Sequence, residues 1–221
     1  MACYIYLKKP NTHALVPYSH FQTSVALKLN IFETHYLSWD LPHKGESLVA
    51  YAKRMTHRVM HKNPVLIGVS FGGILVQEMA KLMEVRKIVL ISSVKSKEEL
   101  PKKMLFAKYT NIHKLIPTQL VANIELVAKF AFGDFLQKRI DLYEKYLSVR
   151  DPYYIDWSID QIVNWNQSAP LSNTVHVHGD LDTVFPVYHL KDYIPIPKGT
   201  HSMIIYKYKW FNENLPNILK D

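Results

Sequence analysis

The segment VLIGVSFGGI, residues 65–74, constrains the fold of this chain more than any other stretch. Three of the seven glycines in the 221-residue sequence lie within these ten positions, on both sides of Ser70. An apolar, β-branched run precedes the glycines, and apolar residues at helical spacing follow them. Gly68-Val-Ser-Phe-Gly72 therefore predicts a strand that turns sharply into a helix, with the hydroxyl of Ser70 exposed at the turn.

Short apolar runs elsewhere in the chain alternate with helical patterns. A helix is expected over residues 46–60, between two of these runs, and another directly after Ser70. Such alternation predicts an α/β fold in which a mostly parallel central sheet carries helices on both faces. The runs expected to form buried parallel strands are residues 4–7, 32–39, 65–69, 85–94 and 174–178.

The alternation stops between residues 96 and 168, where helical patterns such as 120–132 and 135–146 dominate. We therefore expect a core of residues 1–95 and 169–221, with a helical insertion at 96–168. Aromatic side chains of the insertion would suit either a roof over an apolar pocket or the packing of the insertion itself. They are Tyr143, Tyr146, Tyr153, Tyr154, Trp157 and Trp165.

Composition and charge indicate which classes of molecule the protein could bind and where it would be located. The formal net charge is +8, and the densest basic stretch, residues 95–114, holds six lysines. We interpret this stretch as a solvated helical face rather than an anion-binding surface, because no aromatic-interleaved nucleic-acid motif accompanies it. No apolar stretch approaches the length of a membrane span, and no signal peptide is evident. With a single cysteine and no possible internal disulfide, a cytoplasmic location is expected.

A base and an acid that could activate Ser70 follow in the C-terminal part of the chain. Residues 176–186, HVHGDLDTVFP, form an apolar strand pattern that ends in a glycine turn with two aspartates, Asp180 and Asp182. Residues 197–201, PKGTH, place His201 after another glycine turn. The order serine, acid, histidine is the order in which an α/β sheet presents a nucleophile, its orienting carboxylate and its base.

These motifs resemble those of the α/β-hydrolase superfamily, from about residue 32 to the C-terminus. The resemblance is to small uncharacterised bacterial serine hydrolases of the Bacteroidetes type. It implies that Ser70 is the nucleophile, His201 the base and Asp182, in the family's HGxxDxxxP pattern, the acid. It also implies that residues 96–168 form a cap. Such enzymes need no organic cofactor or metal.

The oxyanion hole is less complete in this sequence. The backbone N–H of Phe71, at the start of the helix after Ser70, is expected to be one donor. Hydrolases of this superfamily take a second donor from a glycine-bearing loop after an early strand, but Gly45 is the first glycine here. The aligned stretch, residues 8–13, contains Pro10, which has no N–H, and Asn11, a tentative donor.

Two histidine pairs have spacings that could suit a metal. His176 and His178 lie two residues apart on a strand, and His57 and His61 lie four apart on a helical pattern. Since no third ligand is evident for the helical pair and a strand face beside the site explains the other, we expect no metal.

The sequence thus predicts a serine hydrolase that cleaves an ester, thioester or related acyl bond of a small molecule. Acyl transfer to an acceptor other than water is not distinguished from hydrolysis. The alternative is a weakly active or non-catalytic binding protein of the same fold, favoured by the missing glycine loop.

Overall fold

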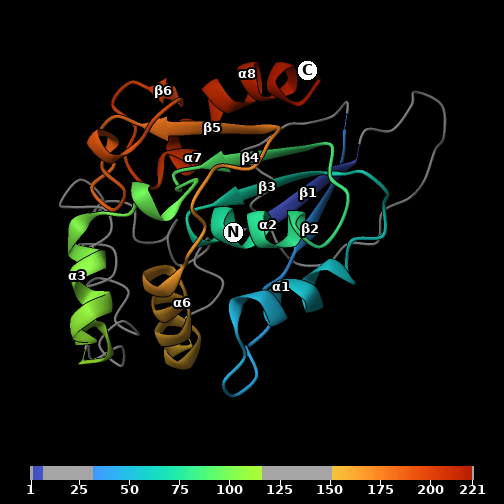
Figure 1. The fold of residues 1–221 in the computed structure, drawn as a ribbon. Helices are drawn as coiled ribbons and strands as arrows, with labels where there is room; N and C mark the ends of the chain where they lie inside the picture. The colour runs from blue at the N-terminus through green and yellow to red at the C-terminus, as the bar shows by residue number, and fades with distance from the viewer. Residues whose placement is uncertain (1, 7–31, 116–150, 221) are drawn as a thin grey trace.

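The computed structural model describes residues 2–6, 32–115 and 151–220. Its centre is a six-stranded sheet with the strand order β2-β1-β3-β4-β5-β6 (Figure 1). The strands are β1 (Ala2–Tyr6), β2 (Glu33–Leu37), β3 (Val65–Val69), β4 (Lys87–Ile91), β5 (Thr174–Gly179) and β6 (Ile194–Ile196).

Five of the six strands run in one direction, which confirms the predicted mostly parallel sheet. Strands β3, β4, β5 and β6 pair in parallel, whereas β1 is antiparallel to both β2 and β3. The prediction of a parallel first strand is therefore wrong. An apolar run shows that a strand is buried but carries no information on its direction, which depends on its long-range partners.

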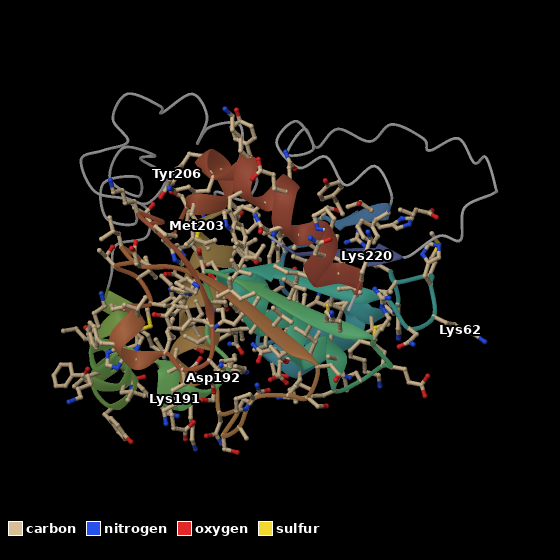
Figure 2. The ribbon with its side chains drawn as sticks, turned by 90° about the horizontal axis from the view of Figure 1, so that it is seen from above. Lys62, Lys191, Asp192, Met203, Tyr206 and Lys220 are labelled. Atoms are coloured by element: carbon tan, nitrogen blue, oxygen red, sulfur yellow. The ribbon has the colours of Figure 1, made fainter. Side chains whose placement is uncertain are left out.

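Helices cover both faces of the sheet (Figure 1). One face packs against α1 (Leu48–Thr56), α2 (Phe71–Ala80) and α6 (Pro152–Asn164), and the other against α7 (Met203–Tyr206) and α8 (Tyr208–Lys220). Seen from above, the segment from Met203 and Tyr206 to Lys220 runs in roughly the same direction as the strands (Figure 2). In β3, Leu66 faces α1 and α2, while its neighbour Ile67 packs in the cluster that contains α8. Burial on both faces explains why this strand is uniformly apolar.

Side chains at the helix N-termini explain where two of these helices begin. The hydroxyl of Ser47 accepts a hydrogen bond from the N–H of Ala50 at the start of α1. At the start of α6, the carboxylate of Asp151 accepts from the N–H groups of Tyr153 and Tyr154, and Pro152 occupies the first helical position. Both arrangements satisfy N–H groups that have no partner within the helix.

The predicted insertion contains α3 (Lys102–Thr110) and α6, together with two short 3₁₀ helices, η2 (Lys97–Glu99) and η3 (Ile112–Leu115). Helix α3 lies on the side of the sheet to which the arrowheads of β3, β4 and β5 point (Figure 1). The helices expected at 120–132 and 135–146 lie outside the described residues. The division into a core and a cap remains a prediction.

Among the helices of the described ranges, none is both long and apolar enough to cross a membrane.

Two glycines bring the last two strands of the sheet close together. A methyl group on Gly179 would overlap the backbone carbonyl of Gly199, and one on Gly199 would overlap the backbone of Gly179. The N–H of Leu181 donates to the carbonyl oxygen of Gly199 at 2.8 Å. The turn that carries Asp182 and the turn that carries His201 are thereby held side by side.

Replacing Gly179 by alanine should separate these two turns. Because backbone rather than a flexible side chain would have to move, we expect a loss of about 1–3 kcal/mol in the free energy of unfolding. Urea denaturation measures it. The matched control is Asp180→Ala, whose side chain is exposed and whose substitution should change stability by less than about 0.5 kcal/mol. Equal stability of Gly179→Ala and the wild type would contradict the role of this close approach.

Candidate active site

Ser70 occupies the turn between β3 and α2 in a strained backbone conformation. Its φ of 55° and ψ of −125° lie in a region that residues with a side chain rarely adopt. The turn is held from β4 and the segment after it, because the Ser70 N–H donates to the carbonyl of Ile91 at 3.0 Å and the Ser70 carbonyl accepts from Ser93 Oγ at 2.8 Å. Such strain in a conformation fixed by its neighbours is typical of a functional position.

His201 contacts both of the residues that the sequence pairs with it. Its Nε2 lies 2.8 Å from Ser70 Oγ, and its Nδ1 lies 2.8 Å from Asp182 Oδ2. The imidazole is only 9% exposed and packs edge-on against the ring of Phe185. The structure thus brings Ser70, His201 and Asp182 into one hydrogen-bonded chain.

Asp182 is a fully buried carboxylate with hydrogen-bond donors at both oxygens. Its Oδ1 accepts from the N–H groups of Val184 at 2.8 Å and Phe185 at 3.0 Å, within its own turn. Burial alone would raise the pKa of Asp182, but attraction to His201 and hydrogen bonds from His178 and His201 outweigh it and hold the pKa below its usual range. The carboxylate is therefore ionised at neutral pH.

Asp180, the other aspartate of this turn, is exposed. The carboxylate that accepts the hydrogen bond of His201 is that of Asp182, as the family pattern predicts, and not that of Asp180.

A second histidine reaches the same carboxylate. The Nε2 of His178 lies 3.2 Å from Asp182 Oδ2 and 2.9 Å from the carbonyl oxygen of Phe185. Since both groups only accept hydrogen bonds, Nε2 of His178 carries a proton. Its other ring nitrogen, Nδ1, lies 3.0 Å from Nε2 of His176, which is also buried. The hydrogen-bonded chain therefore continues behind Asp182 into the sheet.

The sequence did not predict this continuation. His176 and His178 alternate in a strand with apolar neighbours, and two residues apart they point to the same face of the sheet. The alternation placed His176 and His178 side by side but could not show that His178 contacts Asp182. The available signal for this contact was the dipeptide His178-Gly179, which immediately precedes the turn that carries Asp182. A residue at that point lies next to the Asp182 carboxylate.

Phe71 and Asn11 differ in how far the structure describes them. Phe71 is the first residue of α2, a position at which the N–H has no acceptor within the helix. Asn11 lies outside the described residues. The register pairs Ala2 with Gly68 and Ile5 with Val65, so β1 ends at the edge of the sheet away from Ser70.

Among the described residues, one group of side chains could hold a metal ion. Glu33 and His35 on β2 and His61 after α1 place their ligand atoms within 4.8 Å of one another. His61 therefore groups with His35 and not with His57, the partner that helical spacing suggested. Glu33 pairs with Tyr6, at the edge of the sheet opposite Ser70, so this group takes no part in the chemistry of Ser70.

Aromatic side chains of α6 belong to the core. Trp157 is 8% exposed, packs at an angle against the rings of Tyr51 and Phe71, and donates from Nε1 to the carbonyl of Glu46 at 2.7 Å. Tyr154 is buried in the same cluster, and Tyr153 is exposed. Trp165, just after α6, donates to Glu78 Oε1. Core packing therefore accounts for the buried members, while Tyr143 and Tyr146 lie outside the described residues.

Comparison with solved structures identifies the fold. A hydrolase from Pseudomonas aeruginosa PA01 is similar with a TM-score of 0.62 at 13% identity, over 86% of this chain and 79% of its own. The esterase EaEST from Exiguobacterium antarcticum is similar with a TM-score of 0.56 at 16% identity, over 86% of this chain and 81% of its own. The esterase RhEst1 from Rhodococcus sp. ECU1013 is similar with a TM-score of 0.53 at 13% identity, over 79% of this chain and 71% of its own. The fold is that of the α/β-hydrolases.

Sequence comparison adds a family. The model of the uncharacterised protein family UPF0227 matches residues 10–142. No curated protein matches the sequence.

The buried His176 makes the stability of the fold depend on pH. Burial, followed by the charges of His178 and Lys95, lowers the pKa of His176 from 6.5 to about 3. Between these two values the unfolded chain binds a proton that the folded protein does not, so stability must fall as the pH is lowered from about 6.5 toward 3. One such proton contributes a slope of up to about 1.4 kcal/mol per pH unit.

His176→Gln should flatten this part of the profile, because glutamine does not titrate and can still donate toward His178. Urea unfolding at pH 4, 5 and 6 gives the slope for the variant and the wild type. Parallel profiles would show that His176 is not the group responsible.

Proposed function

The chain belongs to the uncharacterised protein family UPF0227, and we propose that it is a serine hydrolase that cleaves a carboxylic ester, thioester or related acyl bond. The observation that carries the proposal is the chain of hydrogen bonds from Ser70 Oγ through both nitrogens of His201 to the buried carboxylate of Asp182. A nucleophile, a base and an orienting acid in this geometry suit acyl transfer through a covalent intermediate.

In the first half of the reaction, Ser70 Oγ attacks the carbonyl carbon of the substrate while His201 Nε2 accepts the hydroxyl proton. The resulting imidazolium is stabilised by Asp182, which stays ionised throughout. His201 then donates the proton to the leaving alcohol or thiol as its bond to the carbonyl carbon breaks. An acyl ester on Ser70 remains.

In the second half, His201 removes a proton from water, and the water oxygen attacks the acyl carbon. The proton returns to Ser70 Oγ as the ester bond breaks, releasing a carboxylic acid and restoring the serine. The negative charge on the carbonyl oxygen in each step would be stabilised by the N–H of Phe71 at the start of α2. Asn11 remains a tentative second donor.

The proposal also covers the cap, the cofactors, the kind of substrate and the location of the protein. Residues 96–168 would form the cap over the core of residues 1–95 and 169–221. The reaction uses no metal or organic cofactor, the substrate is a small molecule and not a nucleic acid, and a cytoplasmic location remains the expectation from the single cysteine.

A second candidate function is binding without catalysis on the same fold. It is favoured by the sequence before Gly45, which lacks the glycine-bearing loop that supplies the second oxyanion donor. Loss of one such donor lowers turnover by a factor of about 10² to 10³, so this departure predicts a slow enzyme unless Ser70, His201 and Asp182 are also inactive.

Ser70→Ala should abolish hydrolysis of p-nitrophenyl esters, because the substitution removes the nucleophile. Turnover should fall by a factor of up to about 10⁶. The matched control is Ser158→Ala, since the Ser158 hydroxyl bonds to the Ile155 carbonyl of its own helix and should not affect the rate. Equal turnover by Ser70→Ala and the wild type would contradict the proposal, and a wild type without activity would favour the binding protein.

Asp182→Asn and Asp180→Asn test which aspartate orients the base. Asparagine at position 182 can present N–H to His201 Nδ1 and favour the wrong tautomer, so turnover should fall by about 10⁴. Asp180→Asn should stay within about twofold of the wild type, because its side chain is exposed. The same loss in both variants would refute this assignment.

A further inference from the structure

Three side chains of the types that bind transition metals meet beside the first half of β2. Glu33 and His35 lie on β2, and His61 lies in the connection between α1 and β3. The Nε2 atom of His35 is 3.1 Å from Oε1 of Glu33, and the Nε2 atom of His61 is 4.0 Å from the same oxygen. Two imidazole nitrogens therefore approach one carboxylate oxygen from two segments of the chain. We call Glu33, His35 and His61 the β2 cluster.

The fold brings these side chains to one face of the sheet. Side chains alternate along a strand, so Glu33 and His35 point to the same face as Leu37. Leu37 packs in the same core cluster as Leu48 of α1. The β2 cluster therefore lies on the face that α1 covers, where the chain that leaves α1 brings His61 to it.

Arg58 holds this connection against the chain that follows β2. Its guanidinium donates to the carbonyl oxygen of Ser38 at 2.9 Å, to the Ser38 hydroxyl at 3.0 Å and to the carboxylate of Asp40 at 2.9 Å. Three residues after Arg58, His61 meets the first half of β2, so the connection runs back along the strand. Contacts outside the β2 cluster thus hold His61 in place, which is the support that a metal ligand needs from its surroundings.

The spacing of the ligand atoms suits a single ion. Every pair of ligand atoms in the β2 cluster lies within 4.8 Å. In a tetrahedral zinc site with bonds of about 2.0–2.1 Å, neighbouring ligand atoms are about 3.3–3.4 Å apart. The separations of 3.1 and 4.0 Å from the Glu33 oxygen lie on either side of this value. Small rotations of the side chains would therefore bring all three atoms within bonding distance of one ion.

An ion also suits the chemistry of the β2 cluster better than two ion pairs do. The ring centroids of His35 and His61 are 4.6 Å apart, so two protonated imidazoles here would repel each other while they share one carboxylate. A neutral imidazole instead gives its Nε2 lone pair to an ion and keeps its proton on Nδ1. The three side chains are 24–28% exposed, which leaves an ion a path of entry from solvent.

The ligand types select the class of ion. Two imidazoles and one carboxylate form a ligand set that Zn²⁺ and other divalent transition metals accept. Mg²⁺ and Ca²⁺ prefer oxygen ligands alone. Three protein ligands leave the fourth position of a tetrahedral ion to water.

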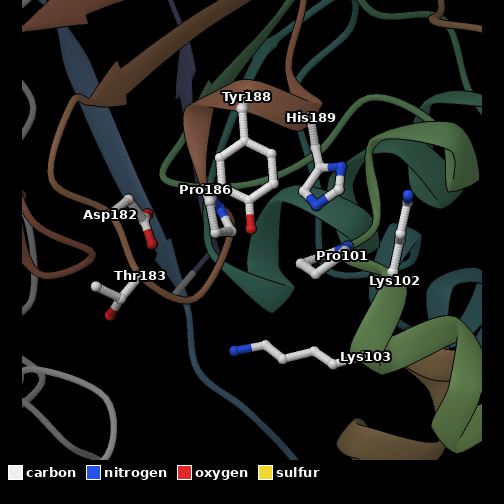
Figure 3. A pocket seen from close by; sticks show the side chains of 8 residues that line it. All are labelled: Pro101, Lys102, Lys103, Asp182, Thr183, Pro186, Tyr188 and His189. Atoms are coloured by element: carbon white, nitrogen blue, oxygen red, sulfur yellow. The ribbon is translucent and has the colours of Figure 1, made fainter.

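The β2 cluster is separate from the candidate active site. Figure 2 shows Lys62, the neighbour of His61, on the opposite side of the molecule from Met203, which follows His201 by two residues. A pocket of about 670 Å³ opens between the turn that carries Asp182 and the beginning of α3 (Figure 3), and no residue of the β2 cluster lines it. An ion in the β2 cluster would therefore act on the fold and not on the reaction.

We propose that Glu33, His35 and His61 bind one divalent transition-metal ion such as Zn²⁺, with water as the fourth ligand. Because β2 is the outermost of the described strands, the ion joins the edge of the sheet to the connection between α1 and β3. Its ligands come from two segments that only the folded chain brings together, so binding stabilises the fold. The proposal replaces the expectation of no metal, for which His61 was paired with His57 and lacked a third ligand.

Calorimetric titration of the protein without an affinity tag tests the proposal, with ZnCl₂ as the ligand and MgCl₂ as the comparison. We expect one Zn²⁺ to bind per chain and Mg²⁺ not to bind. At free Zn²⁺ about 100-fold above its dissociation constant, the midpoint of thermal unfolding should rise by about 5–10 °C. X-ray absorption by the bound zinc should show nitrogen and oxygen neighbours at about 2.0–2.1 Å, including two imidazoles.

Glu33→Gln, His35→Gln and His61→Gln should each weaken Zn²⁺ binding by more than about 100-fold, because loss of a ligand costs more than loss of a group that orients one. Each should also remove the rise in the unfolding midpoint. His57→Gln is the matched control, since His57 is an exposed histidine four residues before His61. Its affinity for Zn²⁺ should equal that of the wild type. Unfolding of each variant in EDTA shows that it is folded without the ion.

The absence of saturable Zn²⁺ binding to the wild type would overturn the proposal, as would full affinity in any of the three variants or an equal loss in His57→Gln. If a variant does not fold, the zinc absorption spectrum of the wild type decides, because a shell with fewer than two imidazoles contradicts these ligands. None of these measurements uses ester hydrolysis, so a failure of the proposed function leaves the test unchanged.

Discussion

The sharp turn from β3 into α2 is the constraint on which the rest of the site depends. Helix α2 begins one residue after Ser70, and a side chain on Gly68 would overlap the carbonyl of Gly72. A side chain on Gly73 would meet Ser93, the residue whose hydroxyl holds the Ser70 carbonyl. Because β4 and the segment after it support this turn from the side, Ser70 keeps a backbone conformation that it would not adopt in a free peptide. In this conformation the Ser70 hydroxyl lies within hydrogen-bond distance of His201 Nε2.

The partners of Ser70 are positioned by the same means, a close approach of backbone to backbone. Gly179 lies against Gly199, so the turns that follow β5 and β6 place Asp182 and His201 next to each other. Behind the carboxylate, His178 and His176 continue the hydrogen bonds through a buried region, where an unpaired polar group would be costly. The acid is thus held from two sides, by its own turn and by the strand that precedes it.

Parts of the structure could be predicted because local sequence determines them. The bounds of β3 were predicted to the residue, since a fully buried strand must be apolar and the glycines mark its end. The pairing of Ser70, His201 and Asp182 followed from the order of three glycine turns. The direction of β1 could not be predicted, because it depends on contacts between segments far apart in the sequence. The interaction of His178 with Asp182 could not be predicted for the same reason.

The most direct test of the central claim is covalent labelling by a fluorophosphonate, which reacts with serines only when a neighbouring base activates them. The purified protein is incubated with the probe, digested, and the modified peptide is sequenced by mass spectrometry. A stoichiometric adduct on Ser70 that disappears in His201→Ala is the predicted result. An unlabelled protein, or an adduct on another serine, would contradict the claim that Ser70, His201 and Asp182 form a working nucleophile.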